Sequence, residues 1–271
     1  MDSRPIGVFD SGLGGLTAVR QLMLELPGEQ IIYFGDTGRV PYGTRSAETI
    51  TKYARQDIQF LLQFDIKAIM IACNTADATA RQAIAGEYPV PIFGVAEPSA
   101  RAAVAATKNE KVGLIGTTAT IGTKIYERLM KAMRPTVQVM PRACPLLVPM
   151  VENGRIHRGD AVIETLVAEY LQPLKDWGCD TLVLGCTHYP LLGDVIAAFM
   201  GPEVALIDSG REAARAATVE LARQNLLCGR ESGGSCRYYV SDATEGFSQM
   251  ASLFLQRPTD GEVTRINIEA Y

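Results

Sequence analysis

The sequence predicts an α/β protein built on parallel sheets. Short apolar runs that end in small or polar residues recur along the 271 residues, and a longer stretch with helical spacing follows most of them. This alternation is typical of parallel strands joined by covering helices. The runs are IGVFDSG at 6–12, IIYFGDT at 31–37, AIMIACNT at 68–75, PIFGVAE at 91–97, KVGLIGT at 111–117, VQVMPRAC at 137–144, TLVLGCTHY at 181–189 and VALIDSG at 204–210.

Two of the helical segments have clear signals. Residues 160–176 open on Asp160, a good N-cap, and Pro173 is expected to bend or end that helix. Residues 48–64 place apolar side chains on one face, at the three- and four-residue spacings of a buried helix. These side chains are Ile50, Tyr53, Ala54, Ile58 and Leu61.

The order of the runs indicates an internal duplication. Residues 6–12 align with 112–118, and residues 68–76 align with 181–189, although chance similarity between apolar strands is a competing explanation. We therefore expect two pseudo-symmetric α/β domains with the active site in the cleft between them. The predicted boundaries are 1–98 plus 208–271 for the first domain and 99–207 for the second. CGRESGGSC at 228–236 is expected to be an exposed loop.

Composition excludes several classes of protein. The net charge is −4 with no Lys/Arg block, which argues against a nucleic-acid binder. No apolar run reaches the roughly 18 residues that cross a bilayer, and the N-terminus has no signal-peptide pattern, so we expect a cytoplasmic protein. Six cysteines without a C-x-x-C pair and only two histidines argue against a disulfide framework and a zinc site. We expect no metal and no cofactor.

The candidate site lies at the polar ends of the apolar runs, because ligands of parallel sheets collect beyond the carboxyl ends of the strands. Cys73 and Cys186 occupy equivalent ends, one in each half. A helix N-terminus should lower the pKa of each thiol. Other polar residues at these ends are Asp10, Ser11, Asp36, Thr37, Asn74, Thr75, Thr117, Thr120, Thr187 and His188.

Two thiols on opposite walls of one cleft suit racemisation or epimerisation. One group must remove a proton from a tetrahedral carbon while the other returns a proton to the opposite face, and a thiol can be tuned to either role. Asp10, Asp36, Glu152 and His188 could hold a substrate ammonium or set the protonation of the sulfurs. Asp36 and Glu152 could equally be N-caps or surface carboxylates. Residues two apart do not face each other on a helix, so a Cys186–His188 dyad is not expected.

The sequence around these residues resembles that of the glutamate racemases, cofactor-independent enzymes that supply D-glutamate for peptidoglycan. The resemblance rests on motifs that span most of the chain in the family's order. These motifs are IGVFDSGLGGLTAVR at 6–20, GDTGRVPYG at 35–43, ACNTA at 72–76, VENG at 151–154 and GCTHYPLL at 185–192.

The resemblance implies a role for each matching residue. Cys73 would take the α-proton of D-glutamate and Cys186 that of L-glutamate, with Asp10 assisting the first thiol and His188 the second. Asp36 and Glu152 match further acidic positions near the site. Neutral donors would hold the substrate carboxylates. The substrate-binding positions are Asp10, Ser11, Pro41, Tyr42, Gly43, Asn74, Thr75, Thr117, Thr120, Thr187 and His188.

Two residues depart from the family pattern, and two other functions stay open. Gly38 stands where an alanine is usual, and Ala119 stands where a glycine is common, in a turn expected to need a positive φ. A racemase of aspartate or another acidic amino acid is the first alternative. A catalytically silent ligand-binding or regulatory protein, such as a gyrase inhibitor, is the second. The expected partner is a small-molecule substrate, with no membrane and no requirement for nucleic acid, and a homodimer is one option.

Overall fold

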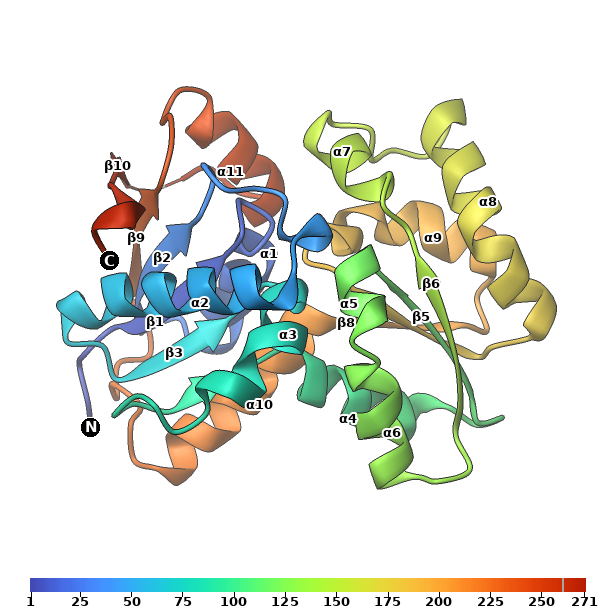
Figure 1. The fold of residues 1–271 in the computed structure, drawn as a ribbon, viewed down its shortest axis with the longest axis horizontal. Helices are drawn as coiled ribbons and strands as arrows, with labels where there is room; N and C mark the ends of the chain where they lie inside the picture. Colours follow the sequence, from blue (N-terminus) through green and yellow to red (C-terminus); the bar gives the residue numbers. More distant parts are fainter. Residues whose placement is uncertain (260) are drawn as a thin grey trace.

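The computed structural model describes residues 1–259 and 261–271, which form two α/β units side by side (Figure 1). One sheet has the strand order β10-β9-β2-β1-β3-β4 and the other has the order β6-β5-β7-β8. Neighbouring strands are parallel in both sheets. The predicted class, an α/β protein with parallel sheets in two units, is confirmed.

Each of the predicted apolar runs contains a strand. The first sheet comprises β1 (Ile6–Asp10), β2 (Gln30–Gly35), β3 (Ala68–Ile71), β4 (Ile92–Phe93), β9 (Ser235–Val240) and β10 (Val263–Arg265). The second comprises β5 (Lys111–Gly116), β6 (Gln138–Ala143), β7 (Thr181–Gly185) and β8 (Ala205–Asp208). Sequence analysis missed β9 and β10. One is exposed at alternate residues and the other has three residues, so neither has a long apolar run.

The helices follow the strands as predicted. They are α1 (Leu16–Glu25), α2 (Ala47–Leu61), α3 (Asn74–Ile84), α4 (Ala96–Ala106), α5 (Thr118–Gly122), α6 (Ile125–Met133), α7 (Leu147–Glu152), α8 (Ala161–Trp177), α9 (Gly193–Met200), α10 (Ser209–Arg223) and α11 (Phe247–Leu255). Short 3₁₀ turns are η1 (Tyr42–Thr44), η2 (Leu62–Phe64), η3 (Tyr189–Leu192) and η4 (Ile268–Ala270).

The details of two predicted segments differ. Asp160 caps α8 through the Val162 amide as expected, but Pro173 does not end the helix, which continues to Trp177. Pro173 lies on the exposed side while Leu171 and Leu174 are buried, and this packing holds the helix across the missing backbone hydrogen bond. The predicted loop at 228–236 gives way to β9 at Ser235.

The two sheets share one topology. In the first, β1 lies between β2 and β3, with β4 outside β3. In the second, β5 lies between β6 and β7, with β8 outside β7. This correspondence matches the predicted duplication. The C-terminal segment adds β9 to β2, and α10 packs on α1 so closely that a Cβ on Gly210 would lie 3.0 Å from the Ala18 Cα. The boundaries at residues 98 and 207 stay a prediction.

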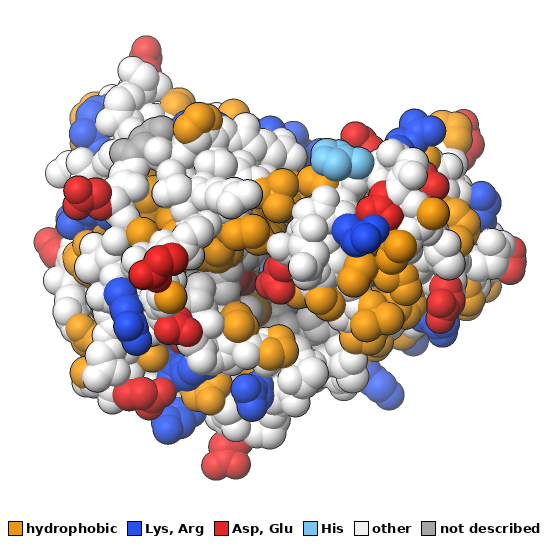
Figure 2. All heavy atoms as spheres, turned by 90° about the horizontal axis from the view of Figure 1, so that it is seen from above, with side chains coloured by type: hydrophobic (Ala, Val, Ile, Leu, Met, Phe, Trp, Pro, Cys, Tyr) orange, Lys and Arg blue, Asp and Glu red, His pale blue; other side chains and the backbone are white. Residues whose placement is uncertain are grey.

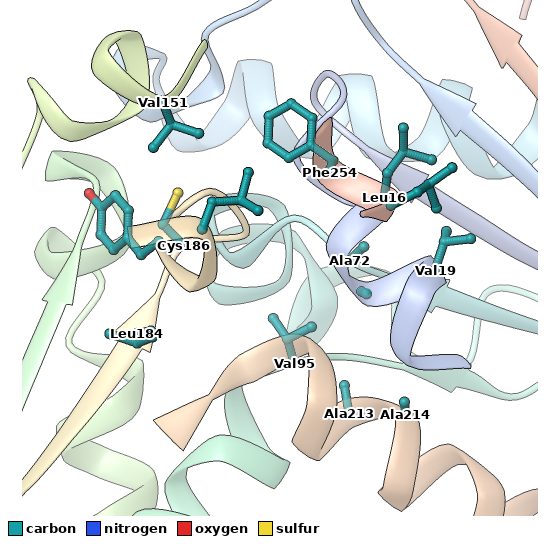
Figure 3. Close-up of a cluster of buried hydrophobic side chains, with 14 of the residues drawn as sticks. Leu16, Val19, Ala72, Val95, Val151, Leu184, Cys186, Ala213, Ala214 and Phe254 are labelled. Atoms are coloured by element: carbon teal, nitrogen blue, oxygen red, sulfur yellow. The ribbon is translucent and has the colours of Figure 1, made fainter. Parts of the chain in front are cut away.

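A buried hydrophobic cluster runs through both units (Figure 3). It contains Leu16 of α1, Leu184 of β7, Cys186 and Phe254 of α11, all of them at most 6% exposed. The two units are therefore packed on a shared core, and the segment that carries Cys186 is part of it. Among the residues described, no helix has the length and apolar character needed to span a membrane.

A buried ion pair near the N-terminus tests how the first unit is held together. The Lys67 ammonium donates to Glu29 Oε2 at 2.5 Å and to the Asp2 carbonyl at 2.8 Å, and its side chain is fully buried. Lys67→Ala should lower the free energy of unfolding by about 3–5 kcal/mol, because Glu29 would keep a buried charge without its cation. Urea unfolding measures the change. The exposed Lys52→Ala is the matched control and should change it by less than about 0.5 kcal/mol.

Candidate active site

A cavity of about 290 Å³ lies between the two units, at the carboxyl ends of both sheets. Seen from above, the molecule is hollowed between its two halves, with hydrophobic side chains around the hollow (Figure 2). Residues from both units line the cavity. They are Ser11, Gly12, Val40, Pro41, Tyr42, Gly43, Thr44, Cys73, Asn74, Thr75, Thr117, Thr118, Pro145, Val148, Pro149, Glu152, Cys186, Thr187 and His188.

Helix starts place several of these side chains. The chain leaves a strand, and the next residues cap a helix with a side-chain acceptor. Cys73 caps α3 by accepting from the Ala76 amide, and Thr117 caps α5 by accepting from the Thr120 amide. The same residues that end the buried strands therefore face the cleft, as predicted from the polar ends of the runs.

Cys73 is a buried thiol at the end of β3. Its sulfur lies 3.4 Å from the Ser11 hydroxyl and accepts from the Ala76 amide at 3.4 Å. Burial and the nearby Asp10 carboxylate raise the pKa of Cys73 to about 12. The prediction of a lowered pKa is therefore wrong for this residue. Desolvation and a like charge outweigh the field of a single helix N-terminus.

Asp10 lies behind Cys73 and does not line the cavity. It ends β1 and is 1% exposed, and its Oδ2 accepts from the Gly12 amide at 3.0 Å. Oδ1 has no hydrogen-bond partner within the described part of the chain. Burial raises the pKa of Asp10, against the opposing effects of the His188 charge and of the Gly12 amide. Asp10 is thus placed to influence the protonation of Cys73 without contacting a molecule in the cavity.

Cys186, His188 and Glu152 form a chain on the other wall. The Cys186 sulfur lies 3.8 Å from His188 Nδ1, and His188 Nε2 lies 3.2 Å from Glu152 Oε1. The expectation that Cys186 and His188 would not meet is wrong, because the segment turns before a helical turn begins at Tyr189. Burial lowers the pKa of His188, but hydrogen bonds with Cys186 and Glu152 outweigh it and raise that pKa to about 10.

The N-terminus of α1 packs directly against this second wall. The Thr17 hydroxyl shares its proton between the Gly14 carbonyl and the Thr187 carbonyl, each at 2.9 Å, and the second bond crosses the boundary between the units. A Cβ on Gly14 would lie 2.4 Å from Thr187 Oγ1 and 2.5 Å from His188 Nδ1, so only glycine fits at this position. Sequence analysis places both residues in the motif at 6–20, and the GLGG run at 12–15 predicts a tight turn into a helix. It did not predict these contacts, since the partners are about 170 residues away.

Hydroxyl and amide groups cluster where α3 meets α5. Thr75 Oγ1 lies 2.9 Å from Thr117 Oγ1 and 3.1 Å from Thr120 Oγ1. The Asn74 amide donates to the Tyr126 hydroxyl at 2.7 Å, while Asn74 Oδ1 has no partner among the residues that the structure describes. Ala119 lies inside α5 without a positive φ, so the expected strain at this turn is wrong.

The structure brings most of the predicted site residues to the cavity, with Asp10, Asp36 and Thr120 behind its surface. Asp36 is fully buried and bonds to Arg39 at 2.6 Å and to Ser241 at 2.8 Å. No cluster of three His, Cys, Asp or Glu side chains suited to a metal occurs in residues 1–259 and 261–271. Sequence analysis gave no role to four apolar residues of the lining, which lie in the GDTGRVPYG motif, just before α7 and on α7. They are Val40, Pro145, Val148 and Pro149.

Comparison with known proteins identifies the family. Residues 17–217 match the family model Asp/Glu/Hydantoin racemase. A glutamate racemase of Syntrophus aciditrophicus is 47% identical over 266 residues, which cover 97% of either chain. A glutamate racemase of Geobacter metallireducens is 44% identical over 270 residues, covering 100% of this chain and 99% of its own.

A solved structure agrees over the whole chain. The crystal structure of glutamate racemase from Francisella tularensis in complex with D-glutamate has a TM-score of 0.91 and 36% sequence identity, and each chain is covered completely. The two-unit fold is thus shared with a solved glutamate racemase. The chain belongs to the Asp/Glu/hydantoin racemase family, within the group of the glutamate racemases.

Proposed function

We propose that the protein interconverts L-glutamate and D-glutamate by proton transfer between the α-carbon and two thiols, without a cofactor. The observation that carries this proposal is that Cys73 and Cys186, one from each unit, line the same cavity. Removal of a proton from one face and its return to the other needs two such groups. The name of the relatives and the D-glutamate in the Francisella tularensis complex support glutamate as the substrate.

Each direction of the reaction moves two protons. From L-glutamate, the Cys186 thiolate takes the α-proton, and the electron pair of the C–H bond stays on the substrate as a carbanion. The Cys73 thiol then gives its proton to the opposite face, which leaves D-glutamate, a Cys186 thiol and a Cys73 thiolate. From D-glutamate the roles are exchanged.

The charges around the two sulfurs suit the direction from L- to D-glutamate. With its pKa raised to about 12, Cys73 is a thiol at neutral pH and is ready to donate. With its pKa raised to about 10, His188 is an imidazolium, and this cation stabilises a thiolate on Cys186. In the reverse direction Cys73 must first give up its proton, and the nearby Asp10 carboxylate would accept that proton and become a neutral acid. The raised pKa of Asp10 supports this role.

Neutral groups supply the contacts for the substrate. Of the residues that line the cavity, none is Lys or Arg, so His188 is the one lining side chain that carries a positive charge. Ser11, Thr75 and Thr187 offer hydroxyl donors for the carboxylates. Asn74 Oδ1, which lacks a partner among the described residues, can accept from the ammonium group. Preorganised dipoles in a small cavity can stabilise the charge of the carbanion.

The biological role follows from the reaction. D-glutamate made in this way would enter peptidoglycan synthesis in the cytoplasm, and the protein would act on a small molecule as a monomer or homodimer. A racemase of aspartate or another acidic amino acid is one alternative. The other alternative is a catalytically silent ligand-binding or regulatory protein. The presence of both thiols in one cavity disfavours it.

The two-thiol assignment makes a direct prediction. Cys73→Ala and Cys186→Ala should each reduce racemisation of glutamate by at least about 10²-fold, because each removes one of the two proton-transfer groups. Circular dichroism at a single wavelength follows rotation, and NMR in deuterated water follows α-proton exchange. Cys144→Ala, a buried cysteine outside the cavity lining, should leave both nearly intact. Near-normal racemisation by Cys186→Ala would contradict the two-base mechanism.

The charge state of His188 can be measured directly. The chain has two histidines, so NMR of labelled histidine resolves both, and His188→Gln assigns the signals. The imidazole of His188 should stay protonated through neutral pH and lose its proton near pH 10. Since its pKa lies above the unfolded value of about 6.5, the stability it adds is full below that pH and disappears as the pH rises through about 10. A His188 that titrates near 6.5 would refute the imidazolium.

A substitution at Gly14 tests how precisely the segment 186–188 must be positioned. Gly14→Ala should lower kcat by about 100-fold, because a methyl group at 2.5 Å from the His188 ring forces His188 and Thr187 away from Cys186. Gly193→Ala adds the same methyl group a few residues beyond His188, where nothing lies within 4 Å, and should keep full activity. Steady-state kinetics on the folded variants compares them. Equal activity of the two variants would show that the Gly14 contact does not matter.

A further inference from the structure

Two acids, Asp36 and Asp57, lie behind the cavity wall, and the proposed two-thiol reaction does not use them. Asp36 follows β2, and Asp57 lies on α2. Both side chains are fully buried. The Tyr42 hydroxyl contacts both of them, Asp36 at Oδ2 and Asp57 at Oδ2, the latter at 3.1 Å. The cavity lining includes Tyr42 but not Asp57.

The charges around this pair do not balance if both acids are ionised. Arg39 is the cation: Nε donates to Asp36 at 2.6 Å and Nη2 donates to Asp57 Oδ1 at 3.1 Å. The other groups that face the pair add no positive charge. They are the neutral Gln56 of α2, the exposed Glu269 of η4, the hydroxyl of Ser241 beyond β9, and Asp10 of β1, which acts at longer range. Two fully buried carboxylates would then share a single guanidinium, which is costly.

The count of protons at Tyr42 indicates which acid is neutral. A tyrosine hydroxyl has one proton to donate and can accept through its oxygen. Its shorter contact is with Asp36, which also accepts from Arg39 and from the Ser241 hydroxyl. The contact with Asp57 Oδ2 is a second hydrogen bond only if Asp57 donates. Burial and the charge of Asp36 raise the pKa of Asp57 well above its ordinary value, in agreement with this count.

We propose that Asp57 is a positioning residue for the racemase site and acts as a neutral carboxylic acid that donates its proton to Tyr42, while Tyr42 donates to Asp36. This inference rests on the proposed function for its kinetic consequence only. The protonation of Asp57 is a property of the folded chain and can be tested without any substrate.

The hydroxyl of Tyr42 anchors one wall of the cavity. Tyr42 begins the η1 turn, which ends where the Arg45 amide donates to the Tyr42 carbonyl. The turn also reaches the other unit, since a Cβ on Gly43 would lie 3.0 Å from the Thr117 Cβ. Thr117 in turn contacts Thr75. The network behind Tyr42 therefore sets how η1 sits against both sides of the cleft.

Loss of Asp57 should weaken binding more than chemistry. Asp57 touches neither thiol in the structure and does not line the cavity, so proton transfer does not involve it. Removal of its hydrogen bonds lets Tyr42 and η1 move and leaves Arg39 with one acceptor fewer. We expect KM to rise while kcat changes little.

Two substitutions of matched size separate a neutral acid from an ion. In Asp57→Asn the amide can donate to Tyr42 and its carbonyl can accept from Arg39, so KM should stay within about threefold of the wild type. Asp57→Leu can do neither, and its KM should rise about tenfold or more with kcat within about threefold. Glu48→Gln, an exposed acid-to-amide change on the same helix, is the control and should alter neither constant.

Infrared spectroscopy tests the protonation directly. The wild-type protein at neutral pH should have a protonated-carboxyl C=O band that the Asp57→Asn variant lacks. The band should therefore appear in the wild-type-minus-variant difference spectrum, whether or not the enzyme is active. Its absence would overturn the neutral-acid assignment, as would a KM for Asp57→Asn as high as that of Asp57→Leu.

An unchanged KM for a folded Asp57→Leu would overturn the positioning role. If Asp57→Leu does not fold, Asp57→Asn and the infrared band still decide whether the acid is neutral, and Asp57→Ser, which keeps a hydroxyl donor but not its reach, replaces Asp57→Leu in the KM comparison. If the wild type fails to racemise glutamate while the band is present, the proposed function fails and the protonated acid remains.

Discussion

The contact between the α1 N-terminus and the segment 186–188 is the constraint on which the rest of the site depends. Two parallel sheets each present a thiol at a carboxyl end, but a shared cavity exists only if those ends face each other at short range. Gly14 permits this approach by having no side chain, and Thr17 fixes it with a hydrogen bond to the Thr187 carbonyl. The duplicated topology supplies equivalent positions for the thiols, and this contact joins them into one site.

The second constraint is electrostatic. The described lining of the cavity contains no Lys or Arg, and several acids near it are buried. Without a cation nearby, a buried acidic group favours its protonated form. Cys73 keeps its proton because burial and Asp10 disfavour a thiolate. His188 holds an extra proton because Cys186 and Glu152 favour the imidazolium. In the proposed mechanism the two walls therefore have opposite roles, one as proton donor and one as base, although each has a cysteine at the same place in its unit. A difference in the neighbours of two equivalent residues creates this asymmetry.

The network of Asp36, Arg39, Tyr42 and Asp57 extends the same principle away from the reacting groups. It links β2, η1 and α2 with the C-terminal residues that return to the first sheet. Because η1 also contacts α5 of the other unit, the hydrogen bonds behind η1 help to fix the position of this side of the cleft. The C-terminal segment, whose described residues do not line the cavity, helps to place one of its walls in this way.

By itself, the sequence determined the alternation of strands and helices, the strand ends at which the cavity lies, and the two cysteines at matching ends. These features depend on backbone geometry and on periodicity over a few residues, so a local pattern is enough to predict them. Tertiary structure alone decided the direction of the Cys73 pKa, the meeting of Cys186 with His188, the continuation of α8 past Pro173, and the pairing of β9 with β2. Each of these outcomes is set by burial or by a partner distant along the chain, and neither burial nor such a partner can be inferred from the neighbouring residues.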